Sequence, residues 1–208
     1  IDVLFTWGMY KPVELCRKAK TLKWIHAISA GVDGMMSSEI ATMDIRITNT
    51  RGIHGMPMSD HALALMLAFL RKLPVLFRQQ QKKQWIKQPT AQETYGKTVG
   101  LLGLGAIGSD IAKKCKALGM RVLATKRTPV ENQWVDQLYH PDQTEKLLKQ
   151  SDFVVIIVPL TPETNKFFGE REIRMMKESA YLINLARGKV VDEEALIKCL
   201  QENVIAGA

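Results

Sequence analysis

Cysteine and long apolar runs are both scarce in this chain. The 208 residues include three cysteines, Cys16, Cys115 and Cys199, and no Cys-x-x-Cys spacing. Three unpatterned cysteines exclude a disulfide-stapled scaffold, so we expect a reducing, cytoplasmic compartment and no bound metal. The longest apolar run, from Ala62 to Leu70, is far shorter than the ~20 residues of a membrane-spanning helix, and no membrane partner is expected.

Acidic residues are outnumbered by basic ones. Lys and Arg total 29 against 21 Asp and Glu, which gives a formal net charge of +8. Such a balance often accompanies nucleic-acid binding, but aromatic residues make up 7% of the chain and are not interleaved with the basic ones, so a nucleic-acid partner is not expected. With 46% hydrophobic residues, the composition is that of a globular protein, and its excess of cations favours one that handles small anions.

Short apolar runs alternate with helical patterns, which is typical of parallel α/β proteins. In the first part we expect a helix and three strands, at Pro12–Lys20, Val3–Trp7, Trp24–Ser29 and Ile45–Asn49. A longer helix is predicted at Pro57–Leu70, with Ser59 and Asp60 in its first turn, and Pro74 ends it. The polar, basic segment Arg78–Lys87 is interpreted as a surface connection. We therefore predict two domains, residues 1–89 and 90–208.

The second part shows a clearer α/β series. Strands are expected at Thr98–Leu102, Arg121–Thr125, Phe153–Val158 and Ala180–Leu185, and the beginning of another at Val204–Ala208. One helix is expected to run to about Leu118, before Gly119, and another from the acids at Asp192 to about Leu200. The continuous apolar run Phe153–Val158 is what a strand buried on both faces requires. This pattern predicts a doubly wound parallel sheet of the Rossmann type.

A glycine-rich turn follows the first strand of this series. Gly103, Gly105 and Gly108 have the G-x-G-x-x-G spacing and stand between an apolar strand and an amphipathic helix. In that context the glycines permit a tight turn, close approach of a pyrophosphate, and packing of the helix on the strand. We therefore predict a dinucleotide site here. A βα turn without a ligand is the alternative.

The residues at the end of the next strand distinguish NADP from NAD. An NAD-binding fold places an acid there, about 20 residues after the first glycine, to bind the ribose 2′-hydroxyl. This chain has Thr125, Lys126 and Arg127 instead, and the nearest acids are Asp110 and Glu131. Because Lys and Arg can pair with a 2′-phosphate that a carboxylate would repel, NADP is predicted over NAD. A solvated charged loop is the alternative.

Four further stretches carry a resemblance to a known family. Asn184–Glu193 resembles the signature of the D-isomer-specific 2-hydroxyacid dehydrogenases, and Val158–Thr164 resembles the loop after a strand of their cofactor domain. Ser29–Asp33 is similar to their substrate-loop motif, and His61–Arg71 to their hinge helix. The resemblance implies that residues 90–208 form a Rossmann-type, NADP-binding cofactor domain and that residues 1–89, including the hinge helix, form part of a smaller flavodoxin-like α/β substrate domain. It also implies hydride transfer between NADP(H) and a small 2-keto or 2-hydroxy acid bound in the cleft between the domains.

Specific residues acquire roles through this resemblance. Arg187 takes the position of the catalytic arginine, where a guanidinium can hold a carboxylate and polarise a carbonyl. The backbone N–H groups of Ala30, Gly31 and Val32 are implied to bind the substrate carboxylate. The implied cofactor contacts are Ala106 and Ile107 at the pyrophosphate, Val158, Pro159 and Thr164 at the adenosine, and Leu185 and Ala186 near the nicotinamide.

The resemblance also implies a proton donor, a histidine paired with a glutamate, beyond Ala208. We interpret the four histidines present, His26, His54, His61 and His140, as structural or solvent residues. The chain is therefore expected to be an interior segment of a longer homodimeric enzyme. Glyoxylate or hydroxypyruvate reduction is the favoured activity. A phosphoglycerate dehydrogenase-like sibling and a dinucleotide-sensing corepressor remain alternatives.

Overall fold

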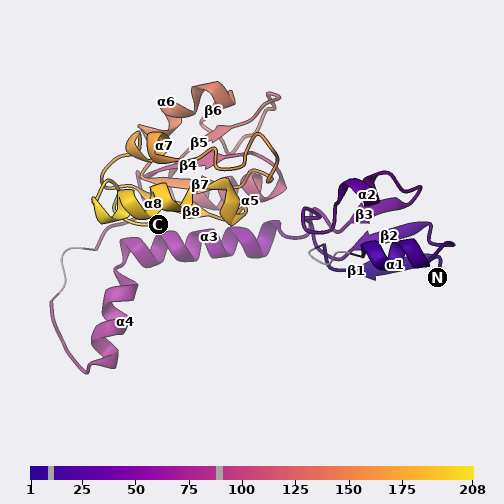
Figure 1. Ribbon diagram of the computed structural model, residues 1–208. Helices are drawn as coiled ribbons and strands as arrows, with labels where there is room; N and C mark the ends of the chain where they lie inside the picture. The colour runs from indigo at the N-terminus through magenta and orange to yellow at the C-terminus, as the bar shows by residue number, and fades with distance from the viewer. Residues whose placement is uncertain (9–11, 88–90) are drawn as a thin grey trace. The chain divides into compact units, whose positions relative to one another are not determined.

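The computed structural model describes residues 1–8, 12–87 and 91–208. The chain forms two compact units, Ile1–His54 and Gly55–Ala208. Both contain parallel sheets flanked by helices (Figure 1). The parallel α/β class predicted from the alternating pattern is therefore confirmed.

The first unit is built on a small parallel sheet. Its strands, in the spatial order β1-β2-β3, are β1 (Val3–Thr6), β2 (Trp24–Ala27) and β3 (Arg46–Asn49), and its helices are α1 (Val13–Lys18) and α2 (Ser38–Ala41). Each strand begins and ends within two residues of its prediction. One face of the sheet buries Ile25 and Ala27 against Cys16, Leu22 and Met35. The loop that follows β2 thus starts from a packed strand end.

The second unit contains a parallel sheet of five strands in the order β6-β5-β4-β7-β8. These strands are β4 (Thr98–Leu102), β5 (Arg121–Thr125), β6 (Gln137–Tyr139), β7 (Phe153–Ile156) and β8 (Tyr181–Asn184). After β4, the chain adds β5 and β6 on one side of that strand and then β7 and β8 on the other side. The strand order therefore reverses between β4 and β7, which is where Rossmann folds bind dinucleotides. The strand predicted at 204–208 is present as one parallel bridge from Gly207 to Tyr181.

Helices cover both faces of this sheet (Figure 1). On one face, α3 (Gly55–Leu70) and α5 (Ala106–Ala117) pack on alternate residues of the central strands. The other face is covered by α6 (Thr144–Leu148), α7 (Glu170–Arg174) and α8 (Glu193–Gln201), with short 3-10 turns η1 (Pro141–Gln143) and η2 (Gly188–Val190). Every residue of β4 and β7 is buried, and burial on both faces explains why all of them except Thr98 are apolar or glycine.

The structure corrects the predicted start of α3. The helix begins at Gly55 rather than Pro57, so its first turn contains no acid. Asp60 lies one turn later and forms an ion pair with Lys114 of α5, which also donates to the Met56 carbonyl at 3.2 Å. The stacking of Phe69 on Tyr181, with ring centroids 4.5 Å apart, attaches the far end of α3 to β8. These contacts make α3 part of the second compact unit, whereas the assignment of residues 1–89 to a substrate domain remains a prediction.

The segment predicted as a surface connection is partly helical. Helix α4 (Leu73–Gln81) includes Arg78, and only residues from Lys82 onward leave the helix. Lys72 is left-handed (φ 58°), which separates α4 from α3, and Pro74 lies in the first turn of α4, where its missing N–H costs nothing. The sequence predicts only that this proline ends the preceding helix. In the described part of the chain, no helix is both long and apolar enough to cross a bilayer.

Candidate active site

At each of the three glycine positions in the turn between β4 and α5, a different physical reason explains why the residue is glycine. Gly103 has φ +108°, a conformation that side chains disfavour. Gly108 lies against the turn itself, because a Cβ there would come within 2.7 Å of the Gly103 carbonyl oxygen. Among the described residues, apart from its two chain neighbours, a Cβ at Gly105 would meet no atom within 4 Å. Gly105 therefore keeps space open beside the backbone rather than relieving a contact inside the protein.

The start of α5 presents unused hydrogen-bond donors. Gly105 and Ala106 are exposed, and within the described residues the N–H groups of Ala106 and Ile107 donate to no protein acceptor. Four N–H groups at a helix start lack helical partners, and the helix dipole favours an anion there. The open space at Gly105 lies next to these donors. The arrangement fits a pyrophosphate, which requires both a close backbone and free N–H groups.

The three residues at the end of β5 occupy different environments. Thr125 is buried, and its hydroxyl accepts a hydrogen bond from the Gly103 N–H at 3.2 Å. Lys126 is half-buried, and its ammonium donates to the Leu104 carbonyl at 2.8 Å. Arg127 is exposed and lines a cavity. Thr125 and Lys126 thus brace the glycine turn, whereas Arg127 faces the space where a ligand would lie.

A cavity of about 350 Å³ opens at the carboxyl ends of the strands. Its lining includes five predicted cofactor contacts, Thr125, Arg127, Val158, Pro159 and Thr164. The rest of the lining comprises Leu102, Pro141, Thr144, Thr161, Glu163, Phe167 and Glu172. Apolar walls with a few polar groups are typical of a nucleotide pocket.

Glu163 is an acidic residue of this cavity that the sequence analysis did not single out. Hydrogen bonds from the Thr161 side chain and from its own backbone lower the pKa of its carboxyl, and the charge of Arg127 lowers it further. Arg127 therefore faces a carboxylate that stays ionised at neutral pH. The sequence places Glu163 in the loop after β7. Its proximity to Arg127, however, depends on the pairing of β4 with both β5 and β7.

The loop after β7 is stabilised by two threonines. The Thr164 hydroxyl donates to the Pro159 carbonyl at 2.6 Å and accepts from the Thr161 N–H at 2.7 Å. The Thr164 N–H in turn donates to the Thr161 side chain at 3.3 Å. Thr164 therefore shapes the wall of the cavity, and its hydroxyl is already occupied by the loop.

Arg187 follows the carboxyl end of β8, next to Leu185 and Ala186. The Asn184 side chain accepts from the Ala186 N–H and donates to the Arg187 carbonyl, both at 3.0 Å. The Arg187 guanidinium is exposed and donates to the Ala186 carbonyl at 3.0 Å. Asn184 thus holds the turn that presents Arg187, a role that the sequence analysis missed although its motif begins with this residue.

The predicted substrate loop follows the carboxyl end of β2 in the first unit. Ala30 is exposed, and Gly31 and Val32 are half-buried. Within the described residues, the N–H groups of these three donate to no acceptor. Consecutive free N–H groups of this kind can bind a carboxylate.

Sequence comparison decides the family. A model described as "D-isomer specific 2-hydroxyacid dehydrogenase, NAD binding domain" matches residues 63–208. This chain belongs to the D-isomer specific 2-hydroxyacid dehydrogenase family. The family membership expected from the sequence is thereby confirmed, and the Rossmann unit is the NAD(P)-binding domain of this family.

Several relatives in the family are named glyoxylate reductase. The protein from Thermococcus gammatolerans is 39% identical over 205 residues, which is 94% of this chain and 61% of that protein. The protein from Pyrococcus horikoshii is 38% identical over 203 residues, with the same coverage of 94% and 61%. The chain therefore spans about 61% of the length of these curated relatives.

Solved structures of family members share the fold. A D-isomer specific 2-hydroxyacid dehydrogenase family protein from Aeromonas salmonicida superimposes with a TM-score of 0.90 at 32% identity, covering 98% of this chain and 65% of that one. An NADPH-dependent glyoxylate/hydroxypyruvate reductase from Sinorhizobium meliloti, solved with NADP and sulfate, gives 0.88 at 26% identity, covering 100% and 66%.

The four histidines of this family member are scattered. His26 bonds through its ring nitrogens to the hydroxyls of Thr48 (2.8 Å) and Thr50 (3.0 Å), and exposed His140 pairs with Asp142 at 2.7 Å. His61 is exposed on α3, and the buried Nδ1 of His54 has no hydrogen-bond partner among the described residues. Their interpretation as structural or solvent residues stays a prediction.

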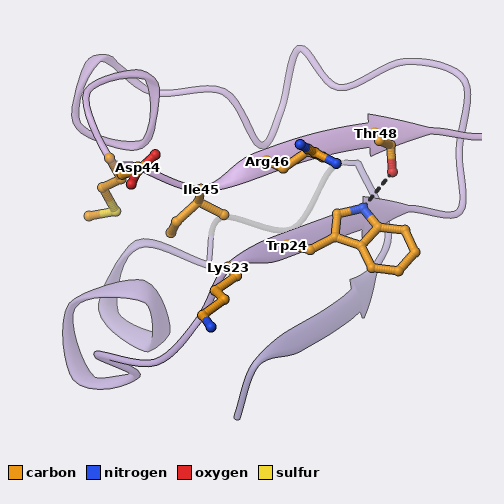
Figure 2. Close-up of a pocket in the computed structure, with 7 residues that line it drawn as sticks. Lys23, Trp24, Asp44, Ile45, Arg46 and Thr48 are labelled. Carbon is orange, nitrogen blue, oxygen red and sulfur yellow. Dashed lines mark hydrogen bonds between the residues drawn. The ribbon is translucent and has the colours of Figure 1, made fainter.

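A second hollow lies on the sheet of the first unit. Figure 2 shows Lys23, Trp24, Asp44, Ile45, Arg46 and Thr48 around it, with the Trp24 indole donating to Thr48 at 2.8 Å. Trp24 and Arg46 are the first residues of β2 and β3. The hollow, of about 840 Å³, therefore begins at the amino-terminal edge of the sheet. The predicted substrate loop follows the opposite, carboxyl-terminal edge.

Proposed function

We propose that this chain is the core of an NADP(H)-dependent reductase of small 2-keto acids, of the glyoxylate or hydroxypyruvate reductase type. The observation that carries the proposal is the edge formed by β4, β5, β7 and β8. There an open glycine turn, a basic ribose site and Arg187 follow the carboxyl ends of neighbouring strands. The names of the relatives and the NADP bound to the Sinorhizobium meliloti protein support the same reading.

The residues at this edge fit a dinucleotide. Ala106 and Ile107 would bind the pyrophosphate through their N–H groups, with Gly103 and Gly108 shaping the turn and Gly105 leaving room. The adenosine would occupy the cavity beside Val158, Pro159 and Thr164, and Leu185 and Ala186 would lie near the nicotinamide. When bound, the cofactor supplies the hydride for reduction of the keto group.

The preference for NADP rests on Arg127. Its exposed guanidinium lines the cavity and can bind a 2′-phosphate in bidentate geometry. Lys126 adds positive charge while its ammonium holds the Leu104 carbonyl. The β5 end carries no carboxylate of its own, so a ribose 2′-hydroxyl has no acidic acceptor at the position where NAD-binding folds provide one.

Arg187 of the second unit and the substrate loop of the first are each proposed to bind a group of the 2-keto acid. The guanidinium is permanently charged and is presented by the Asn184-braced turn, so it can hold the substrate and polarise its carbonyl as negative charge develops on oxygen. The N–H groups of Ala30, Gly31 and Val32 would bind the carboxylate. Arg187→Ala should then lower kcat/KM by roughly 100-fold or more.

The test is a spectrophotometric assay of the intact gene product. NADPH oxidation at saturating glyoxylate or hydroxypyruvate should exceed NADH oxidation, with kcat/KM differing by about tenfold or more. Preferential turnover of a phosphorylated hydroxy acid would instead indicate the phosphoglycerate dehydrogenase-like alternative. If the protein binds NADPH but oxidises it with no 2-keto acid, the reductase proposal is wrong and a dinucleotide-sensing role replaces it.

We further propose that the protein works as a homodimer in the reducing environment of the cytoplasm. All three cysteines are buried free thiols. Helix α4 buries none of its residues and exposes Leu73, Leu76 and Phe77, an apolar surface that a second copy could cover. Sedimentation of the intact protein and of Phe77→Glu tests this: the dimer should dissociate in the variant, and a monomeric wild-type protein would contradict the proposal.

A further inference from the structure

The residues around the substrate loop form a set of hydrogen bonds that holds its carbonyl groups. The Asn49 side-chain amide, at the last position of β3, donates to the Ala30 carbonyl. The Ser29 hydroxyl donates to the Gly31 carbonyl at 2.7 Å. Asn49 and Ser29 thus engage two consecutive peptide groups of the loop.

Each of these bonds also orients an N–H group. In a planar trans peptide, the carbonyl of one residue and the N–H of the next point in opposite directions. Fixing the Ala30 carbonyl therefore directs the Gly31 N–H away from Asn49, and fixing the Gly31 carbonyl directs the Val32 N–H away from Ser29. Within the described residues, these two N–H groups have no acceptor of their own.

The Ser29 hydroxyl is itself held in one orientation. It accepts a hydrogen bond from the Gly8 N–H at 3.0 Å, so its proton remains available for the Gly31 carbonyl. A Cβ at Gly8 would lie 2.0 Å from the Gly31 oxygen and 2.3 Å from the Ser29 Oγ. Only glycine at position 8 therefore allows this contact.

We propose that Asn49 and Ser29, supported by Gly8, are positioning residues that aim the Gly31 and Val32 N–H groups at the carboxylate of the substrate. The inference rests on the proposed function, because it assumes that this loop binds a 2-keto acid. Pre-orienting donors before binding matters because free peptide groups would otherwise lose rotational freedom on binding. Neither side chain needs to touch the substrate.

The experiment compares Asn49→Ala, Ser29→Ala and Gly8→Ala in the intact gene product. We expect KM for glyoxylate to rise roughly 10- to 100-fold, as for a lost hydrogen bond to a charged group, with kcat at saturation within about threefold and KM for NADPH unchanged. Ser29→Thr, which keeps the hydroxyl, should retain most of the affinity. Arg46→Gln, at the opposite end of β3, is the matched control.

A second readout keeps this inference separate from the proposed activity. Binding of oxalate, measured by calorimetry, reports on the carboxylate site without turnover, and it should weaken in the same variants. Wild-type affinity for oxalate and glyoxylate in both Asn49→Ala and Ser29→Ala would overturn the positioning role, even if the enzyme is a reductase. A parallel loss of NADPH affinity would also overturn it, since a general structural defect explains that result. Oxalate binding that depends on Asn49 in a protein without reductase activity would refute the activity alone.

Discussion

At the scale of single residues, the adjacent basic residues Lys126 and Arg127, which follow β5, make different contacts. Lys126 binds the Leu104 carbonyl inside the glycine turn, and Arg127 lines the cavity. Two adjacent basic residues that look alike in the sequence therefore have different roles: Lys126 shapes the turn, and Arg127 faces the space for the ligand.

Replacing each cation separately should show this division. Arg127→Ala should weaken NADPH binding by roughly 10- to 100-fold and leave NADH binding unchanged, since only the 2′-phosphate loses a charge-assisted bond. Lys126→Met should weaken both cofactors, because the turn loses its brace. Fluorescence titration of the two variants with NADPH and NADH measures both effects. Equal loss of both cofactors in Arg127→Ala would contradict the assignment.

Glu163 should oppose the preference for NADP. Its carboxyl has a lowered pKa, chiefly through the hydrogen bond from Thr161, so its negative charge persists across the neutral pH range beside Arg127. Glu163→Gln removes that charge and keeps the shape. We expect NADPH affinity to rise by about two- to fivefold with NADH affinity unchanged, since the pair is exposed and screened. A fall in NADPH affinity in the same titration would refute this role.

At the scale of elements, the turn between β4 and α5 separates fold from function within one motif. Gly108 is required by packing against the Gly103 carbonyl, whereas Gly105 borders open space. In the turn after β8, the hydrogen bonds of the Asn184 side chain hold the backbone that presents Arg187. Both turns follow carboxyl ends of parallel strands, which explains why one sheet edge collects the site.

Alanine substitutions at these two glycines should therefore affect different quantities, NADPH binding at Gly105 and stability at Gly108. Gly105→Ala should keep the melting temperature near that of the wild type but weaken NADPH binding at least tenfold, because its Cβ would fill the space beside the pyrophosphate donors. Gly108→Ala should lower the free energy of unfolding by about 1–3 kcal/mol, since its Cβ would contact the Gly103 oxygen. Calorimetric melting with and without NADPH distinguishes them. An unstable Gly105→Ala would mean that the glycine serves the fold.

At the scale of the whole molecule, the second unit buries a thiol that links its stability to alkaline pH. Cys115 lies in the core formed by α5, α3 and the sheet, and burial raises its pKa to about 12. An unfolded thiol titrates near 8.5, so above that pH the unfolded chain releases a proton that the folded chain keeps. The stability contributed by this group is present below pH 8.5 and is lost as pH rises toward 12.

The expected loss is up to about 1.4 kcal/mol per pH unit above pH 8.5. Urea unfolding of the wild type and of Cys115→Ala between pH 8 and 10.5 isolates the contribution of Cys115 to the free energy of unfolding, because the lysines and tyrosines titrate equally in the two proteins. The variant should lose stability less steeply with pH. Parallel slopes for the two proteins would show that Cys115 does not control this dependence.

Seven of the eight strands in the described residues were predictable to within two residues, because their apolar runs are local. The short elements β6, α6 and α7 were not predicted, since segments of three to five residues show no clear period. In the site, Gly103, Gly105, Gly108 and Arg187 were found through spacing and resemblance. Glu163 and Asn49 were not, because their partners lie on other strands or loops and no local pattern marks such a contact.

Sequence alone specifies the alternating α/β order, the glycine turn and the absence of an acid after β5, because each depends on neighbours along the chain. The tertiary structure decides which of these residues meet. It assigns Lys126 to the turn and Arg127 to the cavity, brings Glu163 to the same cavity, and joins Asn49 to the loop after β2. These pairings follow from strand order and register, which are set by burial of the sheet faces over the whole unit rather than by any local segment.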